Sequence, residues 1–255
     1  MAKTHKKLAI GIDIGGSGIK GAPVSMKTGE FKADRLRIPT PENASPEVIA
    51  GIVKEIADSF DLPTAPVGVT FPAPIVNGKV PFMANLSQEW VGVKVQKLFE
   101  KVLDRPVTVV NDADAAGYAE VYFGAAHGHP GTIIMLTLGT GIGSALVREG
   151  VLVPNTEFGH VILPETKVLA EKYAAASVFE NEKLSFEEWA PRLQELFSYL
   201  EKLFSPDLFI VGGGVSKRHK QFLPLLETRA TIVPAELRNT AGIVGAALLA
   251  HQRSK

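Results

Sequence analysis

The amino-terminal stretch Leu8-Ala9-Ile10-Gly11-Ile12-Asp13-Ile14-Gly15-Gly16-Ser17-Gly18-Ile19-Lys20-Gly21 predicts a buried strand that runs into a glycine-rich turn. Ala22-Pro23-Val24 follows, and because proline disfavours a helix, a second extended segment is expected after the turn. The stretch contains a literal G-x-G-x-x-G, but that motif binds a dinucleotide only when a helix follows it. A nicotinamide site is therefore not predicted.

A second unit of strand, glycine turn and strand occurs in the middle of the chain. Residues 131–138 predict a strand, Gly139-Thr140-Gly141-Ile142-Gly143 a turn, and residues 144–147 another extended segment. With a one-residue gap, Asp13 and Thr137 hold the same place in the two copies. Each turn exposes backbone N–H groups that can cradle phosphate oxygens, although each could also be a simple tight turn.

A third predicted strand, residues 208–211, ends in Gly212-Gly213-Gly214, and three such strand ends favour phosphate or nucleotide binding. Asp13 and Asp112 also end predicted strands, at the edge where open α/β sheets bind ligands. A carboxylate there either holds Mg²⁺, often through water, or takes a proton from an attacking hydroxyl. Asp13 suits the metal and Asp112 the base. The alternative for Asp112 is the N-cap of the next helix, a role that Asp114 could equally take.

The remaining pattern is that of an α/β protein. Periodic apolar residues and start signals such as Ser45-Pro46 and the capping box Ser185-Phe186-Glu187-Glu188 predict helices. Asn77-Gly78 predicts a hairpin turn. Helices are expected over residues 46–60, 93–103, 114–126, 185–204 and 240–251, and further strands over residues 67–71 and 107–110.

Composition excludes several classes of function. The 255 residues carry 27 basic and 27 acidic side chains, and this zero net charge argues against a general nucleic-acid binder. With no cysteine, the chain has no disulfides, thiol nucleophile, Cys-based zinc ribbon or iron–sulfur cluster. No apolar run reaches the roughly 20 residues that a membrane span needs, so a cytoplasmic protein is expected.

Glu157-Phe158-Gly159-His160 places a carboxylate and an imidazole three residues apart. The pair could be structural, or it could be half of a metal site, which would need two more ligands. It could also bind sugar hydroxyls, for which Asn85, Asn111 and Asp112 would add amide and carboxylate partners.

Five motifs in this order resemble the ROK family of sugar kinases, from about Leu8 to the last predicted helix. Within the family the chain most resembles the polyphosphate/ATP-dependent glucokinases, including the glucomannokinase type, in Ser17-Gly18 and in Ser205-Pro206-Asp207-Leu208-Phe209-Ile210. The motifs are Ile12-Asp13-Ile14-Gly15-Gly16-Ser17-Gly18-Ile19-Lys20, Asn111-Asp112-Ala113, Leu138-Gly139-Thr140-Gly141-Ile142-Gly143, Glu157-Phe158-Gly159-His160 and Val211-Gly212-Gly213-Gly214.

The resemblance implies an α/β, actin-like (ribonuclease H-like) ATPase fold with two lobes around a cleft. The small lobe would be residues 1–112 completed by the helix 240–255, and the large lobe residues 113–239. The implied reaction is Mg²⁺-dependent phosphoryl transfer from polyphosphate or ATP to the 6-hydroxyl of glucose, with mannose as a second sugar. No nucleic-acid or membrane partner is implied, and the apolar helices allow a homodimer. The alternatives are a non-catalytic sugar sensor of the same fold and an ATP-only hexose kinase.

The resemblance also implies roles for single residues. Asp112 would be the catalytic base, and Asp13 would hold Mg²⁺, possibly through water. The sugar contacts would be Asn85, Asn111, Asp112, Glu157 and His160. The phosphate and nucleotide contacts would be Asp13, Gly15, Gly16, Ser17, Gly18, Lys20, Thr137, Gly139, Thr140, Gly141, Gly212, Gly213 and Gly214.

Three features bear on how far the resemblance extends. Many family members carry a Cys-rich zinc segment after Glu-x-Gly-His, but residues 161–176 hold no Cys, so no structural zinc is expected. The family's second sugar-binding glutamate lies beyond that segment and has no matching motif here; Glu171 is taken for this role without one. Only residues 1–7 precede the first strand, so a DNA-binding repressor is not expected. Lys217-Arg218-His219-Lys220 is one candidate for a basic strip that binds polyphosphate, and Lys20 is another; the run 217–220 could also simply be solvated.

Overall fold

The structure is a computed structural model that describes residues 7–42, 44–83 and 86–254. It divides into two compact units, and each has its own hydrophobic core. Unit 1 comprises the chain up to Ala119 together with the chain from Asn239 onward, and unit 2 comprises Glu120–Arg238.

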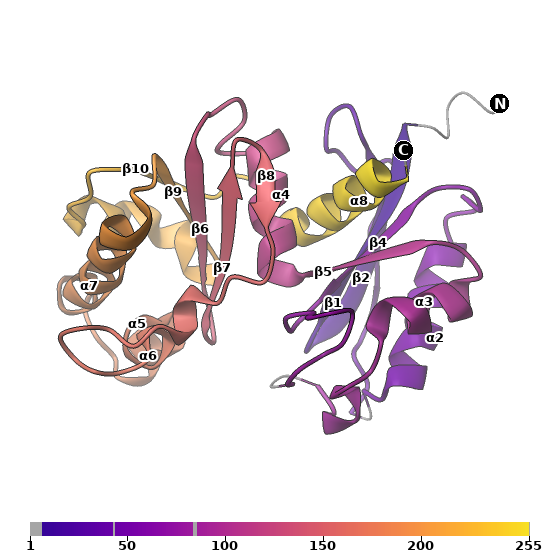
Figure 1. Ribbon diagram of the computed structural model, residues 1–255, viewed down its shortest axis with the longest axis horizontal. Helices are drawn as coiled ribbons and strands as arrows, with labels where there is room; N and C mark the ends of the chain where they lie inside the picture. Colours follow the sequence, from indigo (N-terminus) through magenta and orange to yellow (C-terminus); the bar gives the residue numbers. More distant parts are fainter. Residues whose placement is uncertain (1–6, 43, 84–85, 255) are drawn as a thin grey trace. The chain divides into compact units, whose positions relative to one another are not determined.

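Unit 1 is built on a mixed five-stranded sheet of order β3-β2-β1-β4-β5, of which Figure 1 labels β1, β2, β4 and β5. The strands β1, β4 and β5 run parallel, whereas β2 and β3 are antiparallel additions at one side. The strands are β1 (Leu8–Gly15), β2 (Gly18–Ser25), β3 (Leu36–Ile38), β4 (Val67–Phe71) and β5 (Val107–Asn111). The helical segments are α2 (Pro46–Asp58), the 3₁₀ helix η1 (Gln88–Trp90), α3 (Val95–Leu103) and α8 (Ala241–Arg253), and α4 (Asp112–Phe123) follows β5.

The helix α8 lies directly on the sheet because glycines face it. A Cβ on Gly11 of β1 would overlap the backbone carbonyl of Ile243, and one on Gly68 of β4 would overlap that of Ala246. Alternate residues of the same strands, such as Ile12, face the opposite side and pack with α2 and α3. The pleat therefore gives the sheet one glycine face for α8 and one aliphatic face for the other two helices.

Unit 2 contains a sheet with the same plan. Its strand order β8-β7-β6-β9-β10 repeats β3-β2-β1-β4-β5, and every pair has the matching parallel or antiparallel sense. The predicted internal repeat is thus confirmed. The strands are β6 (Thr132–Leu138), β7 (Ile142–Arg148), β8 (Val151–Val153), β9 (Leu208–Gly212) and β10 (Thr231–Pro234).

Helices pack on the sheet of unit 2, and aromatic side chains contribute to the core of this unit. The helix α7 begins at a capping box, since the Ser185 hydroxyl accepts from the Glu188 N–H at 3.2 Å and the Ser185 N–H donates to the Glu188 carboxylate at 2.8 Å. Trp189 is fully buried and donates to the Ala174 carbonyl. The helical segments are α5 (Ala170–Ala174), α6 (Ala176–Asn181), α7 (Phe186–Phe204) and the 3₁₀ helices η2 (Phe158–His160), η3 (Gly214–Gln221) and η4 (Leu223–Leu225); η5 (Arg238–Thr240) precedes α8.

The predicted elements agree with the structure, with differences at their ends. The helix α4 begins at Asp112 rather than Asp114, because the Asn111 side chain caps it. Ser45 stands at the N-cap of α2 but makes no side-chain capping hydrogen bond. Asn77 and Gly78 adopt the positive φ angles of 51° and 74° that a tight turn between Val76 and Lys79 requires.

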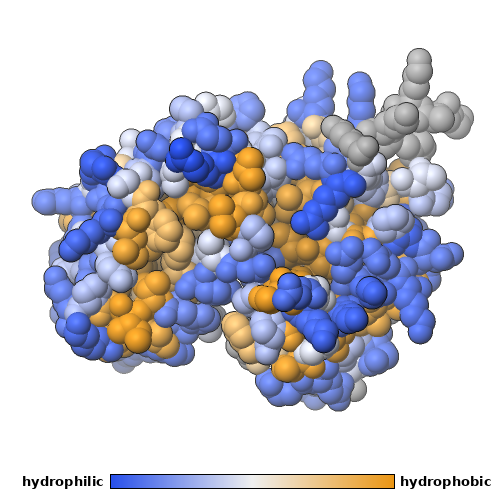
Figure 2. Space-filling view, in the orientation of Figure 1, coloured by the Kyte–Doolittle hydropathy of each residue, from blue (hydrophilic) through white to orange (hydrophobic). Residues whose placement is uncertain are grey.

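The surface of each unit carries both polar and apolar residues, as Figure 2 shows for one face. Within the described part of the chain, no helix combines the length and the apolar character needed to cross a membrane.

We predict that Gly68→Ala lowers the free energy of unfolding by about 1–3 kcal/mol, because the added methyl group forces α8 away from β4. Urea unfolding followed by circular dichroism measures this change. An unchanged unfolding midpoint would contradict the close packing of α8. The matched control is Gly51→Ala in α2, where a Cβ meets nothing within 4 Å. This change should stabilise the protein by about 0.5–1 kcal/mol through helix propensity.

Candidate functional site

The carboxyl edge of the parallel strands in unit 1 brings predicted site residues together. In the sheet register Asp13 of β1 pairs with Thr70 of β4, and Phe71 of β4 pairs with Asn111 of β5. Parallel strands end at the same edge, so Asp13 and Asn111-Asp112 share one edge although they lie far apart in the sequence. The edge predicted for ligand binding in unit 1 therefore carries both carboxylates singled out from the sequence.

The Asp13 carboxylate is held from two sides. Its Oδ1 accepts a hydrogen bond from the Thr70 hydroxyl at 2.7 Å, and its Oδ2 lies 3.7 Å from the Lys20 ammonium. The Asp13 and Lys20 side chains are each about a quarter exposed, at 24% and 25%. At the start of α8, a Cβ on Gly242 would approach the Asp13 Oδ1 to 3.2 Å. Asp13 is thus fixed in place and still reachable from solvent.

Asp13 fits one mode of magnesium binding. In the described part of the chain, no group of three or more carboxylate or imidazole side chains could hold a metal ion. Mg²⁺ does not need such a cage, because it keeps most of its waters and binds through one or two carboxylates and the phosphates of its substrate. A single partly exposed carboxylate is enough for that mode.

The first glycine turn is closed by the pairing of Gly15 with Gly18, which leaves Gly16 and Ser17 exposed at its tip. Two side chains tie its backbone down. The Thr40 hydroxyl donates to the Gly15 carbonyl at 2.5 Å, and the Arg37 guanidinium donates to the Ser17 carbonyl at 2.8 Å. With these carbonyls engaged, the turn is braced in one conformation.

Asn111 and Asp112 stand where β5 passes into α4. The Asn111 Oδ1 accepts from the N–H groups of Ala113 and Asp114, at 2.9 and 3.2 Å, and so caps the helix. Asp112 is exposed, and its Oδ1 accepts from the Ala113 N–H at 2.8 Å. The sequence left Asp112 and Asp114 as candidates for the N-cap of α4, but the main capping side chain is that of Asn111. Asp112 presents its carboxylate at the first turn of the helix.

Unit 2 holds a cluster of two carboxylates and an imidazole. The His160 Nδ1 lies 3.6 Å from the Glu157 Oε2, and the His160 Nε2 lies 3.8 Å from the Glu171 Oε1. The antiparallel bridge between Ile162 and Leu169 folds the chain back and places α5 beside η2. Glu171, which was expected to bind sugar although no motif matched it, therefore lies beside the predicted pair Glu157 and His160.

Burial and the neighbouring charges act on the Glu157 carboxyl of this cluster. Burial raises the pKa of Glu157 above its ordinary value; His160 opposes the rise and the Glu171 carboxylate adds to it. Carboxylate oxygens accept hydrogen bonds, and an imidazole can accept or donate. Such a set suits the several hydroxyl groups of a sugar.

The second glycine turn lies beside this cluster in unit 2. Ser177 of α6 braces it, because its N–H donates to the Gly139 carbonyl at 3.0 Å and its hydroxyl to the Thr140 carbonyl at 2.7 Å. A Cβ on Gly141 would lie 2.6 Å from the Glu171 Oε2. Glycine at this position therefore makes room for the carboxylate.

The third glycine segment lies next to the second. Thr137 of β6 pairs with Gly212 of β9, so both strands end at one edge. Gly213 has a φ of 87°, and a Cβ there would overlap the Leu138 carbonyl. Gly214 follows and begins η3. The glycines thus let the two strand ends approach each other.

The basic segment after the third glycine turn is partly used in packing. The Arg218 guanidinium lies over the ring of Phe186 at 4.4 Å and over that of Phe179 at 5.6 Å. The His219 Nδ1 lies 3.0 Å from the Ser216 carbonyl oxygen. Lys217 and Lys220 are exposed, so the strip considered from the sequence keeps two exposed ammonium groups.

The structure thus groups the predicted residues within each unit, while Asn85 lies outside the described residues. Sequence reasoning missed Thr70, Thr40, Arg37 and Ser177. Thr70 could have been found from its position, because it lies close to the carboxyl end of a buried strand, as Asp13 does. Arg37, Thr40 and Ser177 act through long-range backbone contacts, for which the sequence offers no local signal.

Comparison with known proteins agrees with this geometry. Residues 9–172 match the ROK family. The polyphosphate glucokinase of Mycobacterium tuberculosis strain H37Rv is 43% identical over 96% of this chain and 92% of its own. The structure of the inorganic polyphosphate/ATP-glucomannokinase from Arthrobacter sp. strain KM superposes with a TM-score of 0.87 at 47% identity, over 96% of this chain and 99% of the other. A ROK family glucokinase from Streptomyces griseus, in complex with glucose and AMPPNP, gives a TM-score of 0.80 at 26% identity, over 96% and 99%.

The raised pKa of Glu157 predicts a pH-dependent stability. The Glu157 carboxyl therefore binds its proton more tightly in the folded protein than in the unfolded chain. The free energy of unfolding therefore falls as the pH rises from the ordinary pKa of a glutamate carboxyl through the higher pKa of Glu157 in the folded protein. Glu157→Gln removes this loss, so the variant should gain stability over the wild type between pH 4 and neutral pH. Urea unfolding at both pH values measures the gain.

Glu188→Gln is the control of opposite sign. The capping hydrogen bonds from Ser185 lower the pKa of Glu188, so its contribution is present at neutral pH and fades as the pH falls through the folded pKa. The Glu188 variant should thus be less stable than the wild type at neutral pH. If the Glu157 variant behaved in the same way, Glu157 would be a structural residue.

Proposed function

The chain belongs to the ROK family, and we propose that it is a polyphosphate/ATP-dependent glucokinase. It transfers a phosphoryl group from inorganic polyphosphate or ATP to the 6-hydroxyl of glucose, with mannose as a second acceptor. The observation that carries this proposal is the similarity at 43–47% identity, over 96% of the chain, to two enzymes whose names contain that donor.

Asp112 is the catalytic base of the proposed reaction. Its exposed carboxylate accepts the proton of the sugar 6-hydroxyl as the hydroxyl oxygen attacks the terminal phosphorus of the donor. A new P–O bond to the sugar forms in line with the P–O bond that breaks, and the shortened donor leaves with the bridging oxygen. Asn111 supports this role, because by capping α4 it fixes the backbone that carries Asp112.

The sugar contacts follow from the hydrogen-bonding capacity of each side chain. The Asn111 Oδ1 is occupied by α4, so Asn111 offers its amide N–H groups to a hydroxyl oxygen. In unit 2, Glu157, His160 and Glu171 offer carboxylate and imidazole atoms to sugar hydroxyls. Asn85 is assigned to the same task from the family resemblance alone.

The donor phosphates bind to backbone N–H groups of the glycine turns and to Lys20. Asp13 is the residue that would hold Mg²⁺, directly or through a coordinated water, and the ion would supply positive charge to the donor phosphates there. Gly212-Gly213-Gly214 is assigned to the nucleotide when ATP is the donor. A cytoplasmic location and a homodimer stay predictions.

A coupled assay for glucose 6-phosphate tests the proposal, run first with ATP and then with polyphosphate as the donor. We expect product with both. Product with ATP alone would identify an ATP-only hexose kinase. No product with either donor, together with measurable glucose binding, would identify a sugar sensor.

We predict that Asp112→Asn keeps the fold and the affinity for glucose but lowers kcat by about 10²–10⁴-fold, because the amide cannot accept the proton. Steady-state kinetics and glucose titration measure the two effects separately. The matched control is Asp58→Asn in the same unit, a surface carboxylate paired with Lys54, which should leave kcat unchanged. Near-wild-type turnover of the Asp112 variant would refute the assignment of the base.

A further inference from the structure

A row of polar side chains crosses the sheet of unit 1 next to the first glycine turn. Backbone pairing places Thr70 beside Asp13, Asp13 beside Lys20, and Lys20 beside Arg37. Directly paired residues project from the same face of a sheet. The row therefore contains two neighbouring cations, Lys20 on β2 and Arg37 on the edge strand β3.

The internal repeat differs between the units at this place. In unit 1, β3 pairs with the end of β2 that adjoins the turn, through Ile19–Ile38 and Lys20–Arg37. In unit 2, β8 pairs with the far end of β7, through Arg148–Val151. The first turn consequently gains an arginine, whereas the second has the Glu171 carboxylate beside Gly141.

Arg37 lies against the turn itself. A Cβ on Gly18 would come within 2.8 Å of the Arg37 Nε, so glycine at this position makes room for the guanidinium. The hydrogen bond to the Ser17 carbonyl uses one of the five N–H donors of the guanidinium. The Arg37 side chain is exposed, and its remaining donors present a planar fork that suits phosphate oxygens.

We propose that Arg37, together with Lys20, binds the phosphate groups of the donor that follow the transferred one, and that this site favours polyphosphate over ATP. The inference rests on the proposed function and adds to it a donor-binding residue and a basis for donor preference. Polyphosphate carries charge on every unit along its chain. ATP has only two phosphates beyond the transferred γ-phosphate, and an uncharged nucleoside follows them. A second cation beyond Lys20 therefore contributes more to binding of the longer anion.

The variant Arg37→Ala tests this proposal through two readouts. We expect the KM for polyphosphate to rise about 5–20-fold, because the variant loses a charge-assisted hydrogen bond to the donor. The KM for ATP should rise less than half as much. The slope of log KM for polyphosphate against log salt concentration should fall by about one, since one fewer phosphate charge is neutralised.

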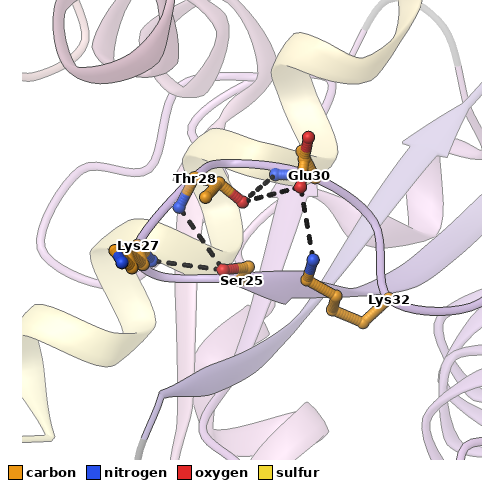
Figure 3. A network of polar contacts seen from close by, with 5 residues as sticks. All are labelled: Ser25, Lys27, Thr28, Glu30 and Lys32. Carbon is orange, nitrogen blue, oxygen red and sulfur yellow. Dashed lines mark hydrogen bonds and ion pairs between the residues drawn. The ribbon is translucent and has the colours of Figure 1, made fainter.

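Two further variants separate binding from a structural role. Arg37→Lys keeps the charge, so it should retain the salt slope of the wild type. Lys32→Ala is the matched charge control: Lys32 pairs with Glu30 at the far end of β2, in the network around Ser25 that Figure 3 shows, and its loss should change neither KM. If Arg37→Ala raised the KM for both donors equally, or left the salt slope unchanged, the proposal would be overturned.

Calorimetric titration of polyphosphate into the wild type and Arg37→Ala tests the inference separately from the proposed function. Weaker binding to the variant by about 5–20-fold supports the site even if the wild type does not turn the donor over. Equal affinity for the two proteins overturns the site even if the wild type makes glucose 6-phosphate from polyphosphate.

Discussion

The close packing of α8 on the sheet of unit 1 is the constraint on which the site in that unit depends. Gly11 and Gly68 allow the backbone of α8 to lie against β1 and β4, and Gly245 allows it to lie against α4. This packing also places Gly242, at the start of α8, beside the Asp13 carboxylate. Residues from the end of the chain thus help to position a carboxylate close to its beginning, and a few glycines determine the geometry.

The two units show how one topology can carry different charged side chains beside its glycine turn. Each has a strand pair closed by a glycine turn and two parallel strands beside it. Around the first turn the added groups are cationic, Lys20 and Arg37, and they suit an anion. Beside the second turn, whose backbone N–H groups are also proposed to bind donor phosphates, the added side chains are Glu157, His160 and Glu171, which we propose bind sugar hydroxyls. The scaffold repeats, and the short elements attached to it differ in charge.

Local sequence signals were enough to predict most of the scaffold and part of the candidate site. Strand-to-glycine transitions located Asp13 and the glycine turns, and the capping box located α7. The start of α4 was misplaced because Asn111, Asp112 and Asp114 are all good capping residues, and only the structure shows which side chain bonds to the helix. Arg37 could not be predicted, since its place beside the first turn depends on the register of a three-residue edge strand.

The proposed activity is tested most directly by ³¹P nuclear magnetic resonance of the protein with glucose, Mg²⁺ and polyphosphate in the absence of ATP. We expect a growing phosphomonoester signal of glucose 6-phosphate, matched by an equal loss of the internal-phosphate signal of the polyphosphate, because each transfer turns the next unit of the chain into its new terminal unit. Release of orthophosphate alone, or an unchanged spectrum, would contradict the assignment of this chain as a polyphosphate-dependent glucokinase.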